Sequence, residues 1–242
     1  MTTVMPLKGA SLMYYPFYFD PTYILMLIPL VVTMIAQARV SGAFNRYSRV
    51  ASRSGMTAAQ VARRLLDDEG LSDVAIERVH GKLSDHYDPR TNVIRLSDSV
   101  YGSASVGAVG VAAHEAGHAV QYAVGYGPIK LRTAILPACQ FGSGAAPYLI
   151  LLGLALSIVE LYIAGIAAFI LVAFFQLVTL PVEFNASRRA LAALTTHGGL
   201  SESDRKGAKK VLTAAAMTYV AALVTSFMQI LYYLSRLNRR RD

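Results

Sequence analysis

The residues from His114 to His118 combine the side chains that zinc-dependent hydrolysis needs. They read His-Glu-Ala-Gly-His, within a run of small and apolar residues at 105–124 that predicts a helix. Four residues are close to one helical turn, so both imidazoles project from the same face and can bind one zinc ion. Glu115 then lies beside the open coordination position, where it can accept a proton from zinc-bound water. The sequence therefore predicts a catalytic Zn2+ site with His114 and His118 as ligands and Glu115 as general base.

The composition indicates that membrane helices position this motif. Of the 242 residues, 54% are apolar and 16% are charged, against about 45–50% and 25% in soluble domains. Four runs contain no charged residue, at 21–38, 133–159, 161–180 and 211–235. The last three are long enough to cross a hydrocarbon core of about 30 Å as helices, and the first is nearly so. We therefore expect a mainly α-helical membrane protein with about four transmembrane helices.

A catalytic zinc site typically uses three protein ligands and a water, so a third ligand must come from elsewhere in the chain. Two predicted spans separate His118 from Glu183, which returns Glu183 to the same membrane face. A Glu on a second helix completes a His2Glu ligand set. Glu160 is excluded, because it lies between two spans and hence on the opposite face. His197 is a weaker alternative ligand, and a surface ion pair is the alternative role for Glu183.

The polar segment before the motif predicts a small α+β domain. Residues 57–60 read Thr-Ala-Ala-Gln, a capping box that opens a helix ending near Gly70. Residues 74–79 and 92–96 have the pattern of strands, with turn signals between them. The second strand could offer an edge to an extended peptide, or it could only brace the metal-binding helix. We expect a zincin-like catalytic domain built on that helix.

This organisation divides the chain into five segments. They are an interfacial segment and transmembrane anchor at 1–38, the catalytic domain at 39–132, a transmembrane hairpin at 133–180, a helix with the third zinc ligand at 181–210, and a transmembrane helix with a basic tail at 211–242.

Three motifs, in this order, resemble those of the YugP-type membrane zinc metallopeptidases of bacteria. They are GKLSDHYDPR with VIRLS within residues 81–97, HEAGHAVQ at 114–121, and LPVEFNASRRA at 180–190. The similarity extends from about residue 40 to residue 219, and the chain more distantly resembles the HtpX-type membrane proteases. The resemblance implies zinc endopeptidase activity with His114, His118 and Glu183 as ligands and Glu115 as base. It implies no particular substrate.

The chain departs from these families close to Glu183. HtpX-type enzymes tend to carry an acidic residue where this chain has Ser187, and the YugP-type group is expected to have Asp where this chain has Asn185. A carboxylate usually orients each ligand imidazole. The acceptor for the imidazole N–H groups therefore stays open between a backbone carbonyl and three side chains: Asp85, Asp88 and Asn185.

The function that these features favour is hydrolysis of peptide bonds by Glu-assisted attack of zinc-bound water. Zinc lowers the pKa of its water to about 7 and polarises the scissile carbonyl, and Glu115 passes the proton on to the leaving amine. The sequence leaves the donor to the oxyanion open between His86, Tyr87 and His197.

Two other functions are alternatives to hydrolysis. A scaffold or chaperone-like binder could keep zinc for structure, but such a site would be closed by four ligands and would have no use for Glu115. A protease that cuts within the bilayer would need the motif inside an apolar span, whereas polar flanks at Arg95 and Lys130 enclose it.

The basic residues indicate the orientation in the membrane. The net charge is +8, and of the 23 Lys and Arg residues 12 lie at 38–132 and six at 181–210. They form no dense block with interleaved aromatic residues, which argues against nucleic acid as a partner. By the positive-inside rule both segments face the cytoplasm. We therefore expect a multi-pass protein of the cell membrane with a cytoplasmic catalytic face, lipid as a partner, and a membrane-associated protein or peptide as substrate. No oligomeric state is predicted.

Overall fold

The computed structural model describes residues 22, 24–81, 84–196 and 199–238. Three predicted features lie outside the described residues: the interfacial segment before residue 22, His197, and the tail from residue 239 onward. The elements are, in chain order, α1 (Ile24–Tyr47), α2 (Ala58–Asp68), β1 (Ala75–Val79), β2 (His86–Asp88), β3 (Val93–Ser97), α3 (Val106–Ala123), α4 (Gly127–Ala155), α5 (Val159–Thr196) and α6 (Glu202–Asn238).

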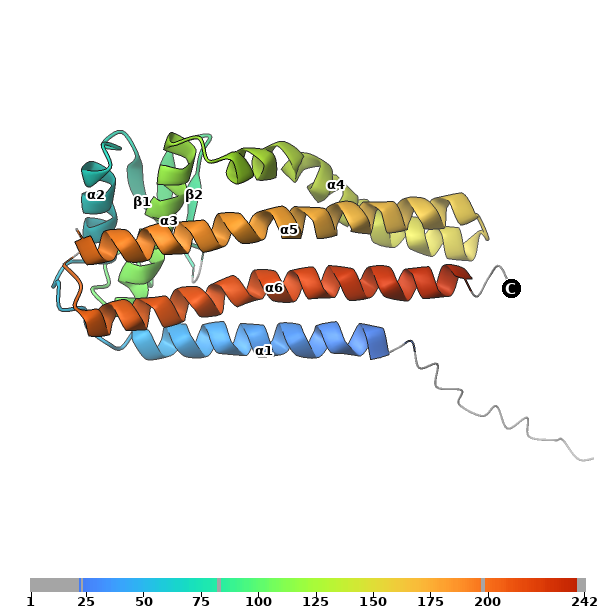
Figure 1. The fold of residues 1–242 in the computed structure, drawn as a ribbon, viewed down its shortest axis with the longest axis horizontal. Helices are drawn as coiled ribbons and strands as arrows, with labels where there is room; N and C mark the ends of the chain where they lie inside the picture. The colour runs from blue at the N-terminus through green and yellow to red at the C-terminus, as the bar shows by residue number, and fades with distance from the viewer. Residues whose placement is uncertain (1–21, 23, 82–83, 197–198, 239–242) are drawn as a thin grey trace, which may run out of the picture.

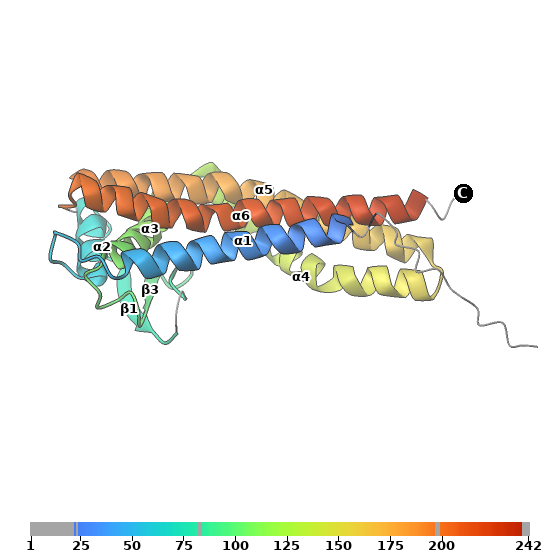
Figure 2. The ribbon, with the colours of Figure 1, turned by 90° about the horizontal axis from the view of Figure 1, so that it is seen from below.

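Four long helices run along the long axis of the molecule, as Figure 1 shows for α1, α4, α5 and α6. Each is long and apolar enough to cross a membrane. Helices α1 and α6 lie against each other, which the view from below in Figure 2 also shows, and α4 and α5 form a hairpin. The prediction of a mainly helical protein with four candidate membrane-spanning helices is confirmed.

Helices α2 and α3 and the strands gather at one end of this bundle (Figure 1). The predicted capping box is present: the Thr57 hydroxyl accepts from the backbone N–H of Gln60, whose side chain accepts from the N–H of Thr57. Ser105 caps α3 in the same way through the N–H of Ala108. Both caps satisfy N–H groups that a helix start leaves unpaired, so they fix where α2 and α3 begin.

The three strands form one sheet in the order β1-β3-β2, with β3 parallel to β1 and antiparallel to β2. Strands β1 and β3 confirm the two predicted strands, with ends displaced by one residue. Because β3 lies in the centre with a partner on both sides, the expectation that it offers an edge to a peptide is wrong. Ile94 and Leu96 of β3 instead belong to the same hydrophobic core as α3, which fits the bracing role.

The long helices continue beyond their apolar runs into this end of the molecule. Helix α5 includes residues 181–196 after the third apolar run, and α6 begins nine residues before the last one, at Glu202. They pack against α3, whose side chains are buried along nearly its whole length. The membrane helices and the polar end therefore share one hydrophobic core, because α5 and α6 supply part of it.

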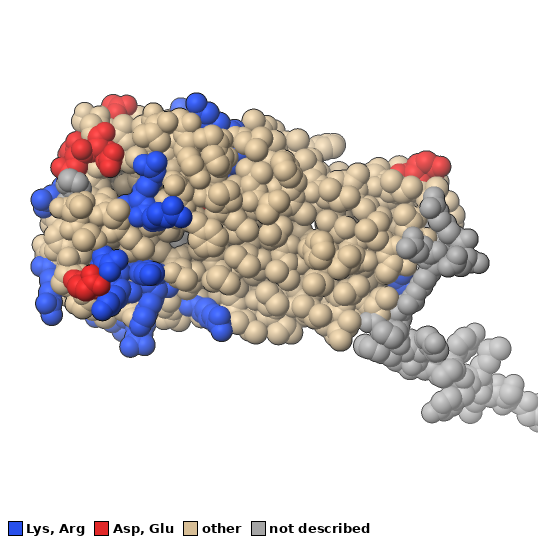
Figure 3. All heavy atoms as spheres, viewed as in Figure 1, with Lys and Arg blue, Asp and Glu red and all other residues tan. Residues whose placement is uncertain are grey.

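Charged side chains gather at the end that holds the sheet, and the middle of the face shown in Figure 3 is uncharged. An acidic group is visible at the opposite end, where α5 begins with Glu160 in its first turn. Such a band between charged ends suits the apolar interior of a bilayer.

Candidate metal centre

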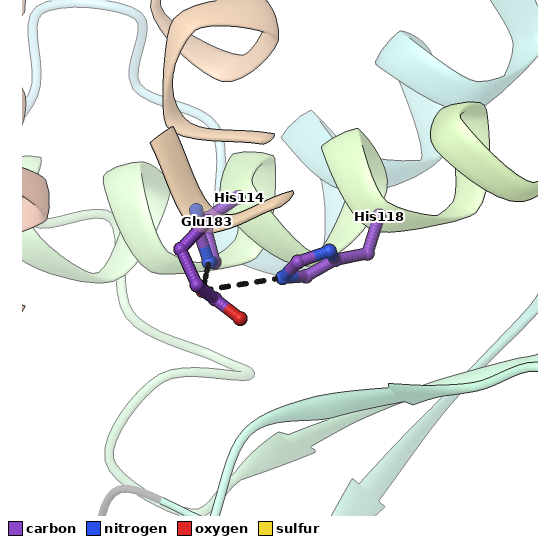
Figure 4. Close-up of side chains that lie close together, drawn as sticks. All are labelled: His114, His118 and Glu183. Atoms are coloured by element: carbon purple, nitrogen blue, oxygen red, sulfur yellow. Dashed lines mark hydrogen bonds and ion pairs between the residues drawn. The ribbon is translucent and has the colours of Figure 1, made fainter. Parts of the chain in front are cut away.

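The side chains of His114, His118 and Glu183 converge on one point between α3 and α5 (Figure 4). One potential ligand atom from each lies within 4.8 Å of the others. Glu183 Oε2 is 3.2 Å from His114 Nε2 and 3.6 Å from His118 Nε2. The four-residue spacing on α3 and the return of the chain through α4 and α5 thus bring the three predicted ligands together.

Glu115 and two of these residues face a common cavity of about 340 Å³. Helices α1, α3, α5 and α6 enclose the cavity, with Glu115, His114 and Glu183 in its wall. Glu115 is 8% exposed and Glu183 is 3% exposed. A carboxylate and a set of metal-ligand groups therefore share a space that could admit part of a substrate.

Gly117 allows α5 to come close enough to complete the site. A Cβ atom at Gly117 would lie 2.7 Å from the backbone oxygen of Ala186, closer than real Cβ contacts. Ala186 lies one turn beyond Glu183 on α5. The glycine inside the His-Glu-Ala-Gly-His motif therefore sets the distance between the two helices that carry the ligand residues.

Gln121 orients His118, a role that the sequence did not reveal. Its Oε1 lies 3.0 Å from His118 Nδ1. Its amide nitrogen donates to the backbone oxygen of Val182 at 2.8 Å and to Asn185 Oδ1 at 2.9 Å. Since a side-chain amide nitrogen only donates, Gln121 Oε1 is left as the acceptor for His118 Nδ1–H. Asn185 therefore acts on His118 through Gln121 and not directly.

Ser187 and Arg132 hold the other two residues of the cluster. Ser187 Oγ is 3.2 Å from His114 Nδ1, so the residue where HtpX-type enzymes tend to have an acid still contacts the imidazole. Arg132 NH1 donates to Glu183 Oε1 at 3.3 Å, which leaves Oε2 for the histidines. The Tyr219 hydroxyl of α6 also interacts with the Glu183 carboxylate. Each group that could bind a metal is thus fixed by a neighbour.

The electrostatics of the cluster favour a bound cation. Burial alone would lower the pKa of His118, but the bond to Glu183 and the charges of Glu115 and Glu183 outweigh burial, so the pKa is raised. A site that attracts a proton to a buried imidazole also attracts a metal ion, and two imidazoles with a carboxylate suit Zn2+. The residues present therefore fit a zinc ion.

Of the other sequence candidates among the described residues, only Asp85 lines the cavity that holds Glu115. Both oxygens of Asp85 accept from Ser97, and burial raises the pKa of this carboxyl despite those bonds. Asp88 binds Thr91 and Arg95 in the β2–β3 hairpin. Within the described residues, the hydrogen-bond partners of these two acids do not include a ligand imidazole. His86 bonds to the Ser84 carbonyl and Tyr87 to Asn92, and neither is among the residues that line the cavity.

Comparison with known proteins also points to a zinc-binding protein. Residues 22–238 match a family described as "Putative neutral zinc metallopeptidase". The chain belongs to this family. It is 46% identical over 207 residues to "Putative membrane protease YugP" of Bacillus subtilis (strain 168), covering 86% of this chain and 92% of that protein. No solved structure matches the chain significantly.

Membership in this zinc metallopeptidase family confirms the resemblance seen in the sequence and implies Zn2+ as the cofactor. Together with the four candidate spans and the similarity to a membrane protease, it makes the protein a multi-pass membrane protein of a protease family.

Proposed function

We propose that this protein is an integral-membrane zinc endopeptidase that hydrolyses peptide bonds at the cytoplasmic membrane face. The observation that carries the proposal is the cluster of His114, His118 and Glu183, whose ligand atoms lie within 4.8 Å of one another. Glu115 and Tyr219 line the same cavity as part of this cluster. That combination matches the needs of hydrolysis better than those of a structural metal site.

The roles of the side chains follow from their chemistry. His114, His118 and Glu183 would hold Zn2+, which when bound supplies Lewis acidity to the scissile carbonyl and activates water. The Glu115 carboxylate takes a proton from the attacking water and returns it to the amine nitrogen as the C–N bond breaks. The Tyr219 hydroxyl donates a hydrogen bond to the carbonyl oxygen as negative charge develops there.

An open site distinguishes this function from a structural one. Among the residues that the structure describes, three ligand groups and not four come together at this cluster. A structural zinc site is normally closed by four protein ligands, whereas a catalytic one keeps a position for water or substrate. The cavity beside Glu115 provides the room for both.

We also propose that residues 39–132 form a zincin-like catalytic domain which 181–210 completes. The boundaries of the segment at 181–210 fall inside α5 and α6, so this domain is continuous with the spans. Thr218 and Tyr219 line the cavity although they belong to the last apolar run. A cavity whose wall includes residues of an apolar run suits substrates that are membrane-associated, such as membrane proteins cut close to the bilayer.

The proposal is tested with full-length protein in lipid nanodiscs, using casein and a detergent-solubilised membrane protein as substrates. Replacing Glu115 by Gln keeps the side-chain shape but removes the proton acceptor. Glu115→Gln should keep its zinc and lose about 10²–10⁴-fold in hydrolysis rate. Chelation should abolish wild-type activity, and added zinc should restore it.

Metal analysis tests the ligand set independently of activity. Glu183→Ala should bind clearly less zinc, whereas Glu160→Ala, on the same helix but at its other end, should bind as much as the wild type. Full zinc occupancy in Glu183→Ala would remove this residue from the site. Substantial turnover by Glu115→Gln would refute the general-base role.

A further inference from the structure

A groove between α5 and α6 adjoins the metal centre and is electropositive. It has a volume of about 730 Å³. Ser187, Leu212 and Ala216 line both this groove and the cavity that holds Glu115. Since Ser187 also contacts His114, one end of the groove lies next to a proposed ligand of the metal.

The charges that line the groove all have one sign. Its lining includes three basic residues, Arg188, Arg205 and Lys209, and no acidic residue. Arg205 is paired with Glu202, whereas Arg188 and Lys209 form no ion pair within the described part of the chain. Both of these side chains are exposed. Figure 3 shows basic side chains gathered over α5 and α6 at the end of the molecule that holds the sheet.

The floor of the groove is largely apolar. It includes Phe184, Leu191 and Leu212, and the exposed ring of Phe184 leaves apolar surface at the end nearest the spans. A strip of apolar side chains flanked by cations suits a segment in which apolar and acidic side chains alternate. It suits neutral or basic segments less well, because these would leave the cations without partners.

The length of the groove limits which part of a substrate it can hold. Along α5 its lining runs from Phe184 to Thr196. At 1.5 Å per helical residue this is about 18 Å, the length of about five extended residues. On α5 the groove lies beyond the third apolar run, which ends at Leu180, and on α6 it reaches Leu212, Thr213 and Ala216 at the start of the last apolar run. The occupant is therefore a short segment next to the membrane.

We propose that this groove binds an acidic, extended segment of the substrate within about five residues of the scissile bond. The inference rests on the proposed endopeptidase function and names its substrate class: membrane-associated proteins with an acidic juxtamembrane segment. Arg188 and Lys209 determine this specificity through their charge. The apolar floor adds affinity without selecting for charge.

The test measures binding, so that it does not depend on hydrolysis. Full-length Glu115→Gln protein is placed in phosphatidylcholine nanodiscs, and fluorescence anisotropy follows labelled peptides of equal length. The peptides share the same apolar residues, which alternate along the segment with Glu, with Gln or with Lys. The Glu peptide should bind most tightly, and its advantage should shrink as salt is raised.

Charge reversals identify the groove as the binding site. Lys209→Glu and Arg188→Glu should each weaken binding of the Glu peptide by about two- to fivefold, the range expected for exposed charge pairs. Lys210→Glu is the matched control, because Lys210 is equally exposed and adjacent in sequence but does not line the groove. The control should bind the Glu peptide as the parent protein does.

Three results would overturn the proposal. The first is equal affinity for the Glu and Gln peptides, and the second is an equal loss of affinity for the Glu peptide in Lys210→Glu. The third is displacement of the Glu peptide by phosphatidylglycerol in the nanodisc, which would make the groove a site for anionic lipid. If the Glu peptide binds as expected but wild-type protein cleaves no peptide, binding of acidic segments in the groove is supported and the endopeptidase function is contradicted. If cleavage occurs without preference for acidic peptides, the endopeptidase function is supported and the selectivity of the groove is contradicted.

Discussion

Gln121 connects the two helices whose residues form the metal centre. Its carbonyl faces His118 on α3, and its amide nitrogen is bonded to the backbone of Val182 and to Asn185 on α5. It is fully buried, so water does not compete for these bonds. A single side chain therefore fixes the tautomer of His118 and ties it to the helix that carries Glu183.

Replacing Gln121 by Leu should weaken zinc binding. The apolar side chain has similar volume but cannot accept the proton of His118 Nδ1, so the imidazole loses its fixed orientation. Loss of such a partner typically costs about 10–100-fold in metal affinity. Competition with a chromophoric zinc chelator measures the change, and circular dichroism of the metal-free protein checks that the variant is folded. An unchanged zinc affinity would show that Gln121 has no such role.

The sequence could predict the cluster but not the residues that orient it. The spacing of His114 and His118 and the passage of two spans before Glu183 are enough to bring these three together. The expected partners of the imidazoles were a backbone carbonyl, Asp85, Asp88 or Asn185, since carboxylates usually serve in this position. The partners found are Gln121 and Ser187. Gln121 follows His118 by three residues on a helix, a spacing that could have suggested contact.

Asp88 gives a pH-dependent contribution to the stability of the β2–β3 hairpin. Hydrogen bonds from the backbone N–H of Arg90, the Thr91 hydroxyl and the Arg95 side chain lower its pKa from 3.8 to about 2. Because the folded pKa is the lower one, the carboxylate stabilises the folded protein fully above pH 3.8. This contribution is lost as the pH falls toward 2, since the unfolded chain takes up the proton first.

Asp88→Asn should therefore lower the thermal unfolding midpoint at neutral pH and matter less in acid. The difference between variant and wild type should be largest above about pH 5 and should shrink between about pH 4 and pH 2. Midpoints of the detergent-solubilised proteins, measured across this range, give the comparison. A difference that is the same at pH 3 and pH 7 would contradict the lowered pKa.

At the scale of elements, close contact between α3 and α5 brings the ligands together. Gly117 lies against the backbone of Ala186, and a methyl group there would come within 2.7 Å of a carbonyl oxygen. Backbone cannot move aside as the end of a flexible side chain can. The two helices would have to separate, and Glu183 would move away from the histidines with α5.

Gly117→Ala should therefore lower both thermal stability and zinc affinity. Overpacking of this kind costs about 1–3 kcal/mol, which outweighs the gain of about 1 kcal/mol that alanine gives over glycine within a helix. Gly144→Ala in α4 is the control, because no atom lies within 4 Å of a Cβ built there. The control should unfold at or above the wild-type temperature. Normal zinc affinity in Gly117→Ala would mean that the distance between α3 and α5 does not control zinc binding.

The prediction of elements succeeded where a local signal was strong. The capping box at Thr57 marked the start of α2 within one residue, because a cap is local chemistry. Strand β2 was missed, since three residues between turn signals are too few for a strand pattern to be recognised. The central place of β3 could not be predicted, because sheet order depends on pairing with β2.

At the scale of the whole molecule, charge separates the two ends of the bundle. Basic residues concentrate at the end with the sheet, as Figure 3 shows, and the positive-inside rule then favours a cytoplasmic location for it. One feature opposes this orientation. Helix α6 carries the chain to the opposite end, where Arg236 lies in its last turn, and three more arginines come later in the sequence, at 239–241. The basic domain after the first span should dominate, because early spans usually fix orientation.

Cysteine labelling tests this orientation directly. On a Cys139→Ala background, Ser72→Cys places a thiol in the exposed loop after α2, and Ser157→Cys places one at the turn between α4 and α5. A membrane-impermeant maleimide added to intact cells should label Ser157→Cys and should label Ser72→Cys only after the membrane is permeabilised. Asn238→Cys, at the end of α6, should behave as Ser157→Cys does if the last helix crosses the bilayer. Labelling of Ser72→Cys in intact cells would place the metal centre outside, and protection of Asn238→Cys would show that α6 does not span.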